Sequence, residues 1–100
     1  MSNEVSAAAA ALSGLRVLDF TGRMGGYCGL LLANLGAEVI LIESPAGDPM
    51  RAEGPFKNGL SDPEKSLSFA AYHTNKRGIT LSMEEDDGRQ TLRNLARQAD

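Results

Sequence analysis

The stretch from Leu15 to Glu43 restricts the fold of this chain more than any other feature of its sequence. An apolar run from Leu15 to Phe20 ends at a group of closely spaced glycines, continues in a helical pattern up to Gly36, and is followed by a second apolar run. This order of strand, glycine-rich turn, helix and strand predicts a βαβ unit of an open α/β sheet, and such sheets bind ligands outside the carboxyl ends of their strands. The turn after Phe20 is therefore the first candidate for a ligand site.

The rest of the chain predicts further elements of the same sheet. Glu38 to Glu43 reads as the second strand, and a long loop rich in Gly, Pro and Asn follows from Asp48 to Pro63. A short helix is expected from Lys65 to His73, and the alternating residues from Ile79 to Met83 predict a third strand. Ser82 to Glu85 matches the capping-box pattern, so we expect the last helix to begin there.

Composition and the two ends of the chain narrow the class of protein. The net charge of -3 lacks the basic footprint of nucleic-acid binding, and no apolar run is long enough to cross a membrane. Residues 1–11 read as a mobile leader without the basic residues of a targeting signal, so a cytoplasmic location is expected. The last helix reaches Asp100 without a glycine or proline stop, so we expect the N-terminal piece of a longer protein.

The single cysteine, Cys28, is predicted to be a small core residue.

The glycine turn is the strongest chemical signal. Free backbone amides at a helix N-terminus suit phosphate or another anion, and Asp19 is expected to accept hydrogen bonds from backbone amides of this turn rather than to act in catalysis. The spacing of Gly22, Gly25, Gly26 and Gly29 matches neither the dinucleotide fingerprint nor a phosphate-binding P-loop. Glu43 nevertheless lies about 20 residues on, where a nicotinamide enzyme has its ribose-binding acid. A nicotinamide-dependent oxidoreductase is therefore one alternative.

A second polar segment precedes the third strand. Asn75, Lys76 and Arg77 read as a solvated turn, with an anion-binding segment as the alternative. His73 has no Cys, Asp or Glu at metal-ligand spacing around it, so no metal site is predicted.

Several groups of residues recur together in the order and spacing of one known family, from Leu12 to Asp100. They are Leu12 to Thr21; Leu32 to Ile40; Ile42 to Pro45 with Gly47, Asp48 and Arg51; Asn75 to Arg77; and Gly88 and Arg89 with Leu92, Leu95, Ala99 and Asp100. Together they resemble the start of a family III coenzyme A-transferase of the CaiB/BaiF type, the group of formyl-CoA transferase, carnitine CoA-transferase and α-methylacyl-CoA racemase.

The resemblance implies that residues 12–100 are the N-terminal CoA-binding α/β domain of a longer protein. That domain would be part of a doubly wound, Rossmann-like, mainly parallel sheet, in a homodimer whose two subunits are interlocked. The resemblance also places CoA beside three strand ends. The residues implied there are Arg23, Met24 and Gly25 after the first strand, Ser44 after the second, and Leu81, Ser82 and Met83 after the third.

The sequence departs from the family at two positions near this implied site. Tyr27 stands after Gly26, where the family usually has proline, and Ser44 stands where several members have arginine. Arg23, Arg51 or Lys76 would then supply the missing positive charge.

The function implied is transfer of CoA from an acyl-CoA to a carboxylic acid through an aspartyl anhydride and an enzyme thioester. The family's catalytic aspartate lies beyond residue 100, so no catalytic residue is predicted in residues 1–100 and this piece alone is expected to be inactive. CoA and acyl-CoA are implied as substrates, with no tightly bound cofactor and no nucleic-acid or membrane partner. An acyl-CoA racemase or epimerase of the same family is the other alternative.

Overall fold

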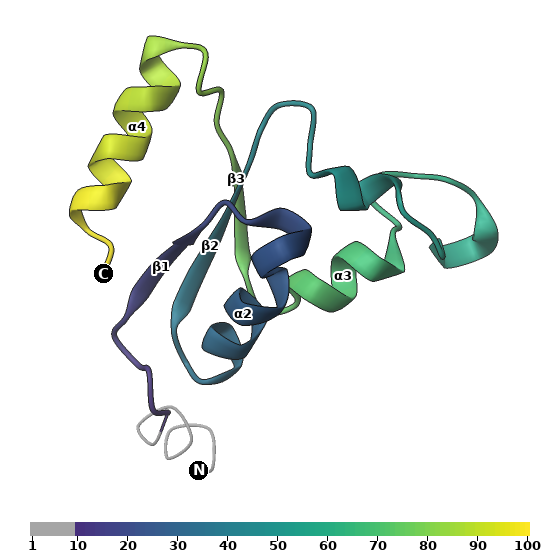
Figure 1. Cartoon of the computed structure of the whole chain (residues 1–100), viewed down its shortest axis with the longest axis horizontal. Coiled ribbons are helices and arrows are strands. Elements are labelled where there is room, and N and C mark those ends of the chain that lie inside the picture. The colour runs from purple at the N-terminus through teal and green to yellow at the C-terminus, as the bar shows by residue number, and fades with distance from the viewer. Residues whose placement is uncertain (1–9) are drawn as a thin grey trace.

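The computed structural model describes residues 10–100 as an α/β fold built on a parallel sheet of three strands. Figure 1 shows the elements in chain order. They are β1 (Arg16–Asp19), α2 (Gly22–Asn34), β2 (Glu38–Glu43), the 3-10 turns η1 (Pro49–Ala52) and η2 (Lys57–Gly59), α3 (Leu67–His73), β3 (Arg77–Thr80) and α4 (Asp86–Arg97). The predicted βαβ unit and parallel sheet are confirmed. The expected leader falls mostly on residues 1–9, outside the described residues.

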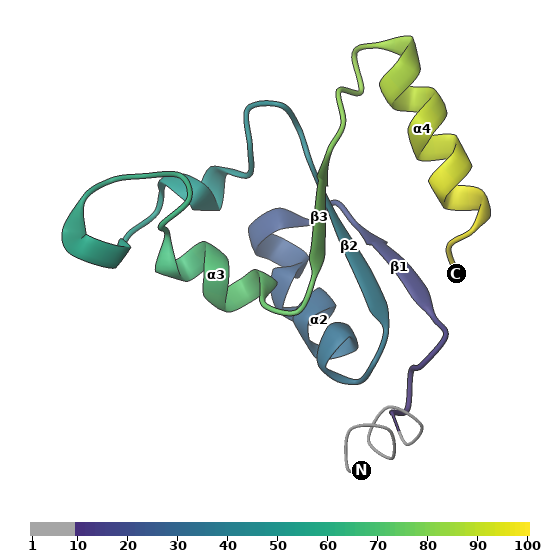
Figure 2. The ribbon, with the colours of Figure 1, turned by 180° about the vertical axis from the view of Figure 1, so that it is seen from behind.

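The strand order β1-β2-β3 puts β2 at the centre of the sheet, and its register pairs Leu18 with Ile40 and Ile42 with Ile79. Each side chain from Val39 to Ile42 is buried, as a strand covered on both faces requires. Helix α2 lies on one face of the sheet, since it is in front of the strands in Figure 1 and behind them in Figure 2. The buried apolar side chains of the described chain are those of β2 residues 39–42 together with Ala37 and Met50.

Helix α2 begins earlier than the glycine pattern predicts. It starts at Gly22, so the expected turn from Gly22 to Gly26 is its first helical turn. Gly26 and Gly29 are its buried residues, and a Cβ atom on Gly29 would lie 2.5 Å from the Asp19 carboxylate. These two glycines let the helix backbone approach its neighbours closely. The helix ends as predicted, with Gly36 at a φ of +107°.

The prediction that Cys28 is a core residue is wrong, because Cys28 is exposed. Gly26 and Gly29 form the buried face of α2, and position 28 lies on another face of a helix with 3.6 residues per turn. Tyr27, which replaces the family's proline, is also exposed at 60%.

The third strand and the last helix are displaced from their predicted ranges. Strand β3 ends at Thr80, and α4 begins only at Asp86, after the N-cap Glu85. The capping box at Ser82 is therefore not used. Gly88 instead packs on the backbone of Ser82, and residues 81–85 form the connection between the two elements.

The expected long loop is an ordered excursion that projects from the sheet and leads into α3 (Figure 1, teal). The Asp48 carboxylate accepts a hydrogen bond from the Met50 amide at 2.8 Å, and Met50 is 2% exposed. The Ser66 hydroxyl lies within donating distance of two carbonyl oxygens, those of Met50 (3.0 Å) and Glu53 (2.7 Å), and it caps α3 by accepting from the Phe69 amide. These bonds tie the base of the excursion to α3.

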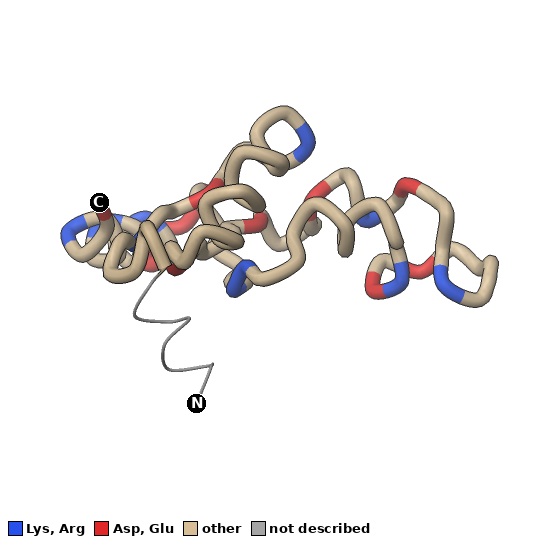
Figure 3. Tube along the Cα trace, turned by 90° about the horizontal axis from the view of Figure 1, so that it is seen from below, with Lys and Arg blue, Asp and Glu red and all other residues tan. Residues whose placement is uncertain are grey.

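Acidic and basic residues are interspersed along the described trace (Figure 3). Within residues 10–100, we find no helix with the length and apolar character needed to cross a bilayer.

Gly88 offers a test of the connection between β3 and α4. A Cβ atom at this position would lie 1.9 Å from the carbonyl oxygen of Ser82. Alanine is better than glycine in a helix by about 1 kcal/mol, but overpacking costs about 1–3 kcal/mol. We therefore expect Gly88→Ala to lower the free energy of unfolding in urea. Gly78→Ala is the control, because its Cβ meets nothing within 4 Å, and an equal loss in both variants would contradict the prediction.

Candidate functional site

A pocket of about 540 Å³ lies at the carboxyl ends of the three strands. It is where an open parallel sheet is expected to bind its ligand. Its walls come from the segments that follow β1, β2 and β3. The lining residues are 20–23, 42–45, 47–50, Glu53 and 81–84.

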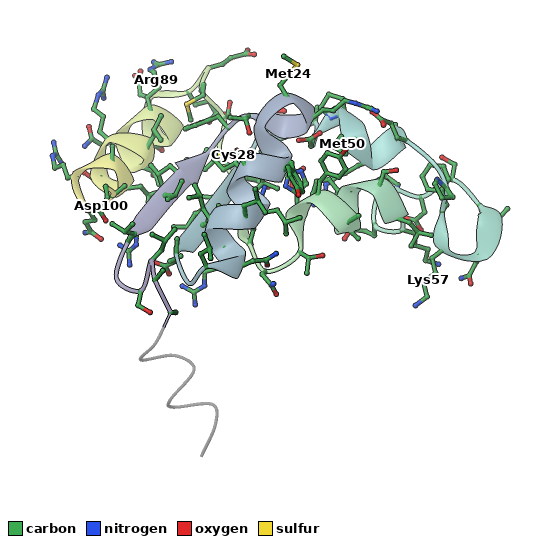
Figure 4. All side chains as sticks on the ribbon, turned by 60° about the horizontal axis from the view of Figure 1, so that its bottom comes forward. Met24, Cys28, Met50, Lys57, Arg89 and Asp100 are labelled. Carbon is green, nitrogen blue, oxygen red and sulfur yellow. The ribbon has the colours of Figure 1, made fainter. Side chains whose placement is uncertain are left out.

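The pocket brings together most of the residues predicted to contact CoA. Those that line it are Arg23, Ser44, Leu81, Ser82 and Met83. Met24 and Gly25 do not line it. The side chain of Met24 is 96% exposed and projects away from the ribbon in Figure 4, and Gly25 packs against the Thr21 side chain. Because residues 81–85 lie outside β3, the third segment reaches the pocket as a connection rather than as a strand.

One wall of the pocket is held by an ion pair between Glu43 and Arg51. Nε and Nη2 of Arg51 each lie 2.7 Å from a carboxylate oxygen of Glu43, which also accepts the Asp48 amide at 2.7 Å. The guanidinium stacks 3.9 Å above the centre of the Phe69 ring. Hydrogen bonding to Arg51 lowers the pKa of Glu43 despite its partial burial. Glu43 is therefore occupied as an ionised structural group, which removes the feature that favoured a nicotinamide site.

A second ion pair lies behind the pocket, between α2 and the ends of β1 and α3. Nζ of Lys76 lies 2.8 Å from Oδ2 of Asp19, 3.0 Å from the carbonyl oxygen of Gly26 and 2.9 Å from Nδ1 of His73. The side chains of Lys76 and Asp19 are 1% and 4% exposed. The prediction that Lys76 belongs to a solvated turn is therefore wrong. The sequence signal for this buried ion pair is the presence of Gly26 and Gly29, because a helix face without side chains leaves room for it.

Asp19 also accepts hydrogen bonds at Oδ1 from the amide (2.8 Å) and the hydroxyl (2.6 Å) of Thr21. The predicted structural role of Asp19 at the start of α2 is thus confirmed. Burial raises the pKa of this carboxyl, but the hydrogen bonds from Lys76 and Thr21 outweigh burial, and the pKa lies below its ordinary value.

His73 connects the two ion pairs. Its ring centre lies 4.6 Å from that of Phe69, on which Arg51 stacks, and its Nδ1 faces Lys76. Burial first, and then the charge of Lys76, lower the pKa of His73, which favours the neutral ring. Its Nε2 is buried and has no hydrogen-bond partner among the residues that the structure describes. Over the same residues, we find no group of three or more His, Cys, Asp or Glu side chains placed to hold a metal ion.

The structure separates the three cations that could recognise an anion. Lys76 is buried with Asp19, and Arg51 is held by Glu43 and Phe69. Arg23 lines the pocket, keeps a side chain that is 64% exposed, and donates from Nη1 to Glu53.

We predict that Lys76→Met is strongly destabilising. It would leave the Asp19 carboxylate buried without its cation, which typically costs roughly 3–5 kcal/mol. Arg77→Met is the matched control, because the neighbouring Arg77 side chain is 75% exposed and its ion pair is worth no more than about 1 kcal/mol. Urea unfolding followed by circular dichroism measures both. Equal losses of unfolding free energy in the two variants would show that the buried ion pair stabilises the fold no more than the exposed one.

Asp19 also predicts a pH dependence. A carboxyl whose folded pKa is lowered adds stability that is fully present above its ordinary pKa of 3.8 and is lost as the pH falls through the folded value. We expect the difference in unfolding free energy between the natural protein and Asp19→Asn to be constant at neutral pH and to narrow below about pH 4. A difference that does not change between about pH 5 and pH 2 would contradict this assignment.

Comparison with known proteins places this arrangement in a family. Residues 12–100 match the family described as CoA-transferase family III. The chain is 42% identical over 88 residues to succinyl-CoA:(R)-benzylsuccinate CoA-transferase subunit BbsE of Thauera aromatica, covering 88% of this chain and 22% of that protein. It is 41% identical over 91 residues to formyl-CoA:oxalate CoA-transferase of Streptomyces avermitilis, covering 90% of this chain and 21% of that protein.

Solved structures agree with this assignment. A CAIB/BAIF family protein from Brucella suis superposes with a TM-score of 0.76 at 35% identity, over 91% of this chain and 24% of that one. The chain thus spans about a quarter or less of the length of the relatives that it matches. With the family's match running from residue 12 to residue 100, this chain belongs to CoA-transferase family III.

Proposed function

We propose that the protein containing this chain transfers CoA from an acyl-CoA to a carboxylic acid, and that residues 12–100 supply segments of its CoA site. The pocket at the carboxyl ends of all three strands carries this proposal, because it gathers Arg23, Ser44 and residues 81–83 from three separate parts of the chain. Relatives named as CoA-transferases for succinyl-CoA and formyl-CoA support the reaction class.

In the proposed reaction, an enzyme carboxylate attacks the thioester carbonyl of the donor and expels the CoA thiolate, forming a mixed anhydride. The thiolate attacks the enzyme's acyl carbon, which releases the donor acid and leaves an enzyme thioester. The acceptor carboxylate then attacks this thioester, which forms a second anhydride and expels the CoA thiolate again. The thiolate finally attacks the acceptor's acyl carbon, which yields the new acyl-CoA and frees the enzyme carboxylate. CoA must stay bound while its thiolate leaves and returns, which is the task we assign to this pocket.

We assign the attacking carboxylate to the protein beyond residue 100. Asp19 is unsuited to attack, because it is buried and held by Lys76 and Thr21. Asp48 lines the pocket, but one of its oxygens already accepts the Met50 amide. Glu43 is held by Arg51 in the same way.

We infer that the sheet continues on the other side of β1 as a doubly wound sheet. The amide of Asp100 donates to the carbonyl oxygen of Arg16 at 2.8 Å, and the Arg16 amide donates to the Asp100 carboxylate at 3.0 Å. Helix α4 thus returns the chain to the strand edge opposite β3 (Figures 1 and 2). The exposed apolar side chains of Tyr27 and Leu31 on α2, and of Leu35 directly after it, support the further proposal of a homodimer with interlocked subunits.

The reaction class can be tested with the full-length protein, an acyl-CoA and a second carboxylic acid. We expect the second acyl-CoA to appear in chromatography with mass detection, at the expense of the first. Loss of stereochemistry at the α-carbon without a new acyl-CoA would indicate a racemase instead. Tight binding of NADH in a titration that shows no binding of CoA would contradict the proposal.

A second experiment tests the assignment of the nucleophile. Residues 1–100 alone are expected to show no CoA exchange, because the attacking carboxylate lies elsewhere. Reproducible exchange catalysed by residues 1–100 would place a nucleophile within this chain.

A further inference from the structure

The charges around the pocket pose a problem for a site that binds CoA, whose nucleotide carries several phosphate charges. Of the described residues that line the pocket, only Arg23 is basic. The acidic ones are Glu43, Asp48, Glu53 and Glu84. A phosphate group in this pocket therefore depends on a single cation for charge complementarity.

The neighbouring cations are already engaged. Both Nε and Nη2 of Arg51 are used by Glu43, and the same guanidinium stacks on Phe69. The side chain of Lys76 is 1% exposed and directs its Nζ at Asp19. Arg89 does not line the pocket, and it donates to the carbonyl oxygen of Met83 at 2.7 Å and to the Asp86 carboxylate. Among the described residues that line the pocket, Arg23 is thus the cation that a ligand can recruit, and it can do so without breaking a buried contact.

Arg23 is itself held by an acid of the same pocket. Its Nη1 donates to Oε1 of Glu53, and this bond links the first turn of α2 to the residue after η1. The two side chains are 64% and 36% exposed. Exposed ion pairs of this kind are weak because water screens them, whereas hydrogen bonds from guanidinium to phosphate are among the strong ones.

We propose that Arg23 leaves Glu53 to bind a phosphate group of CoA, so that Glu53 sets the affinity of the pocket for that phosphate by competing for the same guanidinium. The inference rests on the proposed function, since it takes CoA as the ligand. It assigns Glu53, which no sequence motif singled out, a role in ligand affinity. Several family members have arginine where this chain has Ser44, which lines the pocket. Without that second cation, the affinity for the phosphate depends on the competition between Glu53 and the phosphate for Arg23.

The test is calorimetric titration of the full-length protein with CoA, using Glu53→Gln, Arg23→Gln and the double variant. We expect Glu53→Gln to bind CoA roughly two- to fivefold more tightly at low salt and Arg23→Gln to bind it about tenfold or more weakly. In the Arg23→Gln background, the gain from Glu53→Gln should disappear, because no guanidinium is left to compete for.

Two controls accompany these variants. Glu38→Gln removes the same charge from an ion-paired glutamate at the opposite end of β2, where Arg16 is its partner at 2.5 Å, and it should leave CoA affinity unchanged. Pantetheine lacks the phosphates of CoA, so Glu53→Gln should not bind it more tightly than the natural protein does.

The outcomes separate this inference from the function on which it rests. If the natural protein does not bind CoA, the proposed function fails and the role of Glu53 fails with it. If the natural protein binds CoA but Glu53→Gln brings no gain, only the role of Glu53 is overturned. A gain that persists in the double variant, or that extends to pantetheine, also overturns it, because Glu53 would then act without Arg23 or without a phosphate.

Discussion

The buried ion pair between Lys76 and Asp19 is the interaction on which the rest of this structure depends. It joins the end of β1, the backbone of α2 at Gly26 and the turn before β3. Removing two charges from water costs several kcal/mol for each ion, and close geometry with further hydrogen bonds is needed to offset this. Thr21 and Gly26 supply those bonds. Gly29 makes the geometry possible, because any larger residue would press on both charges.

The same network explains why few charged groups around the pocket are free to bind a ligand. From Lys76 the contacts pass through His73 and Phe69 to Arg51 and Glu43, so that one continuous set of side chains runs from behind the pocket into its wall. Their charged groups hold the strand ends in position and are satisfied by one another. Arg23 and Glu53 form an exposed pair at the surface of the pocket, and in our proposal this pair recognises the anionic ligand. The proposal thus assigns rigidity and ligand binding to different ion pairs.

Local signals predicted the elements with strong patterns. The apolar run of β2 has the predicted bounds, and the left-handed Gly36 ends the turn after α2. The predictions failed where a contact distant in sequence overrides the local pattern. The capping box at Ser82 is not used, since Gly88 packs on its backbone. Cys28 is apolar enough for a core, yet glycines occupy the buried face of its helix.

The sequence by itself determined the α/β class and the parallel βαβ unit, because these follow from periodicity and from residues close together in the chain. It also identified the family, because groups of residues from Leu12 to Asp100 occur in the order and spacing of that family. Only the tertiary structure decided which charges are buried and which remain available. Lys76 and Arg51 have the same sequence character as Arg23, but Lys76 is buried against Asp19 at the end of β1, and Arg51 is held by Glu43 at the end of β2. Whether a cation is screened by water or fixed in the interior depends on such contacts, and local sequence does not specify them.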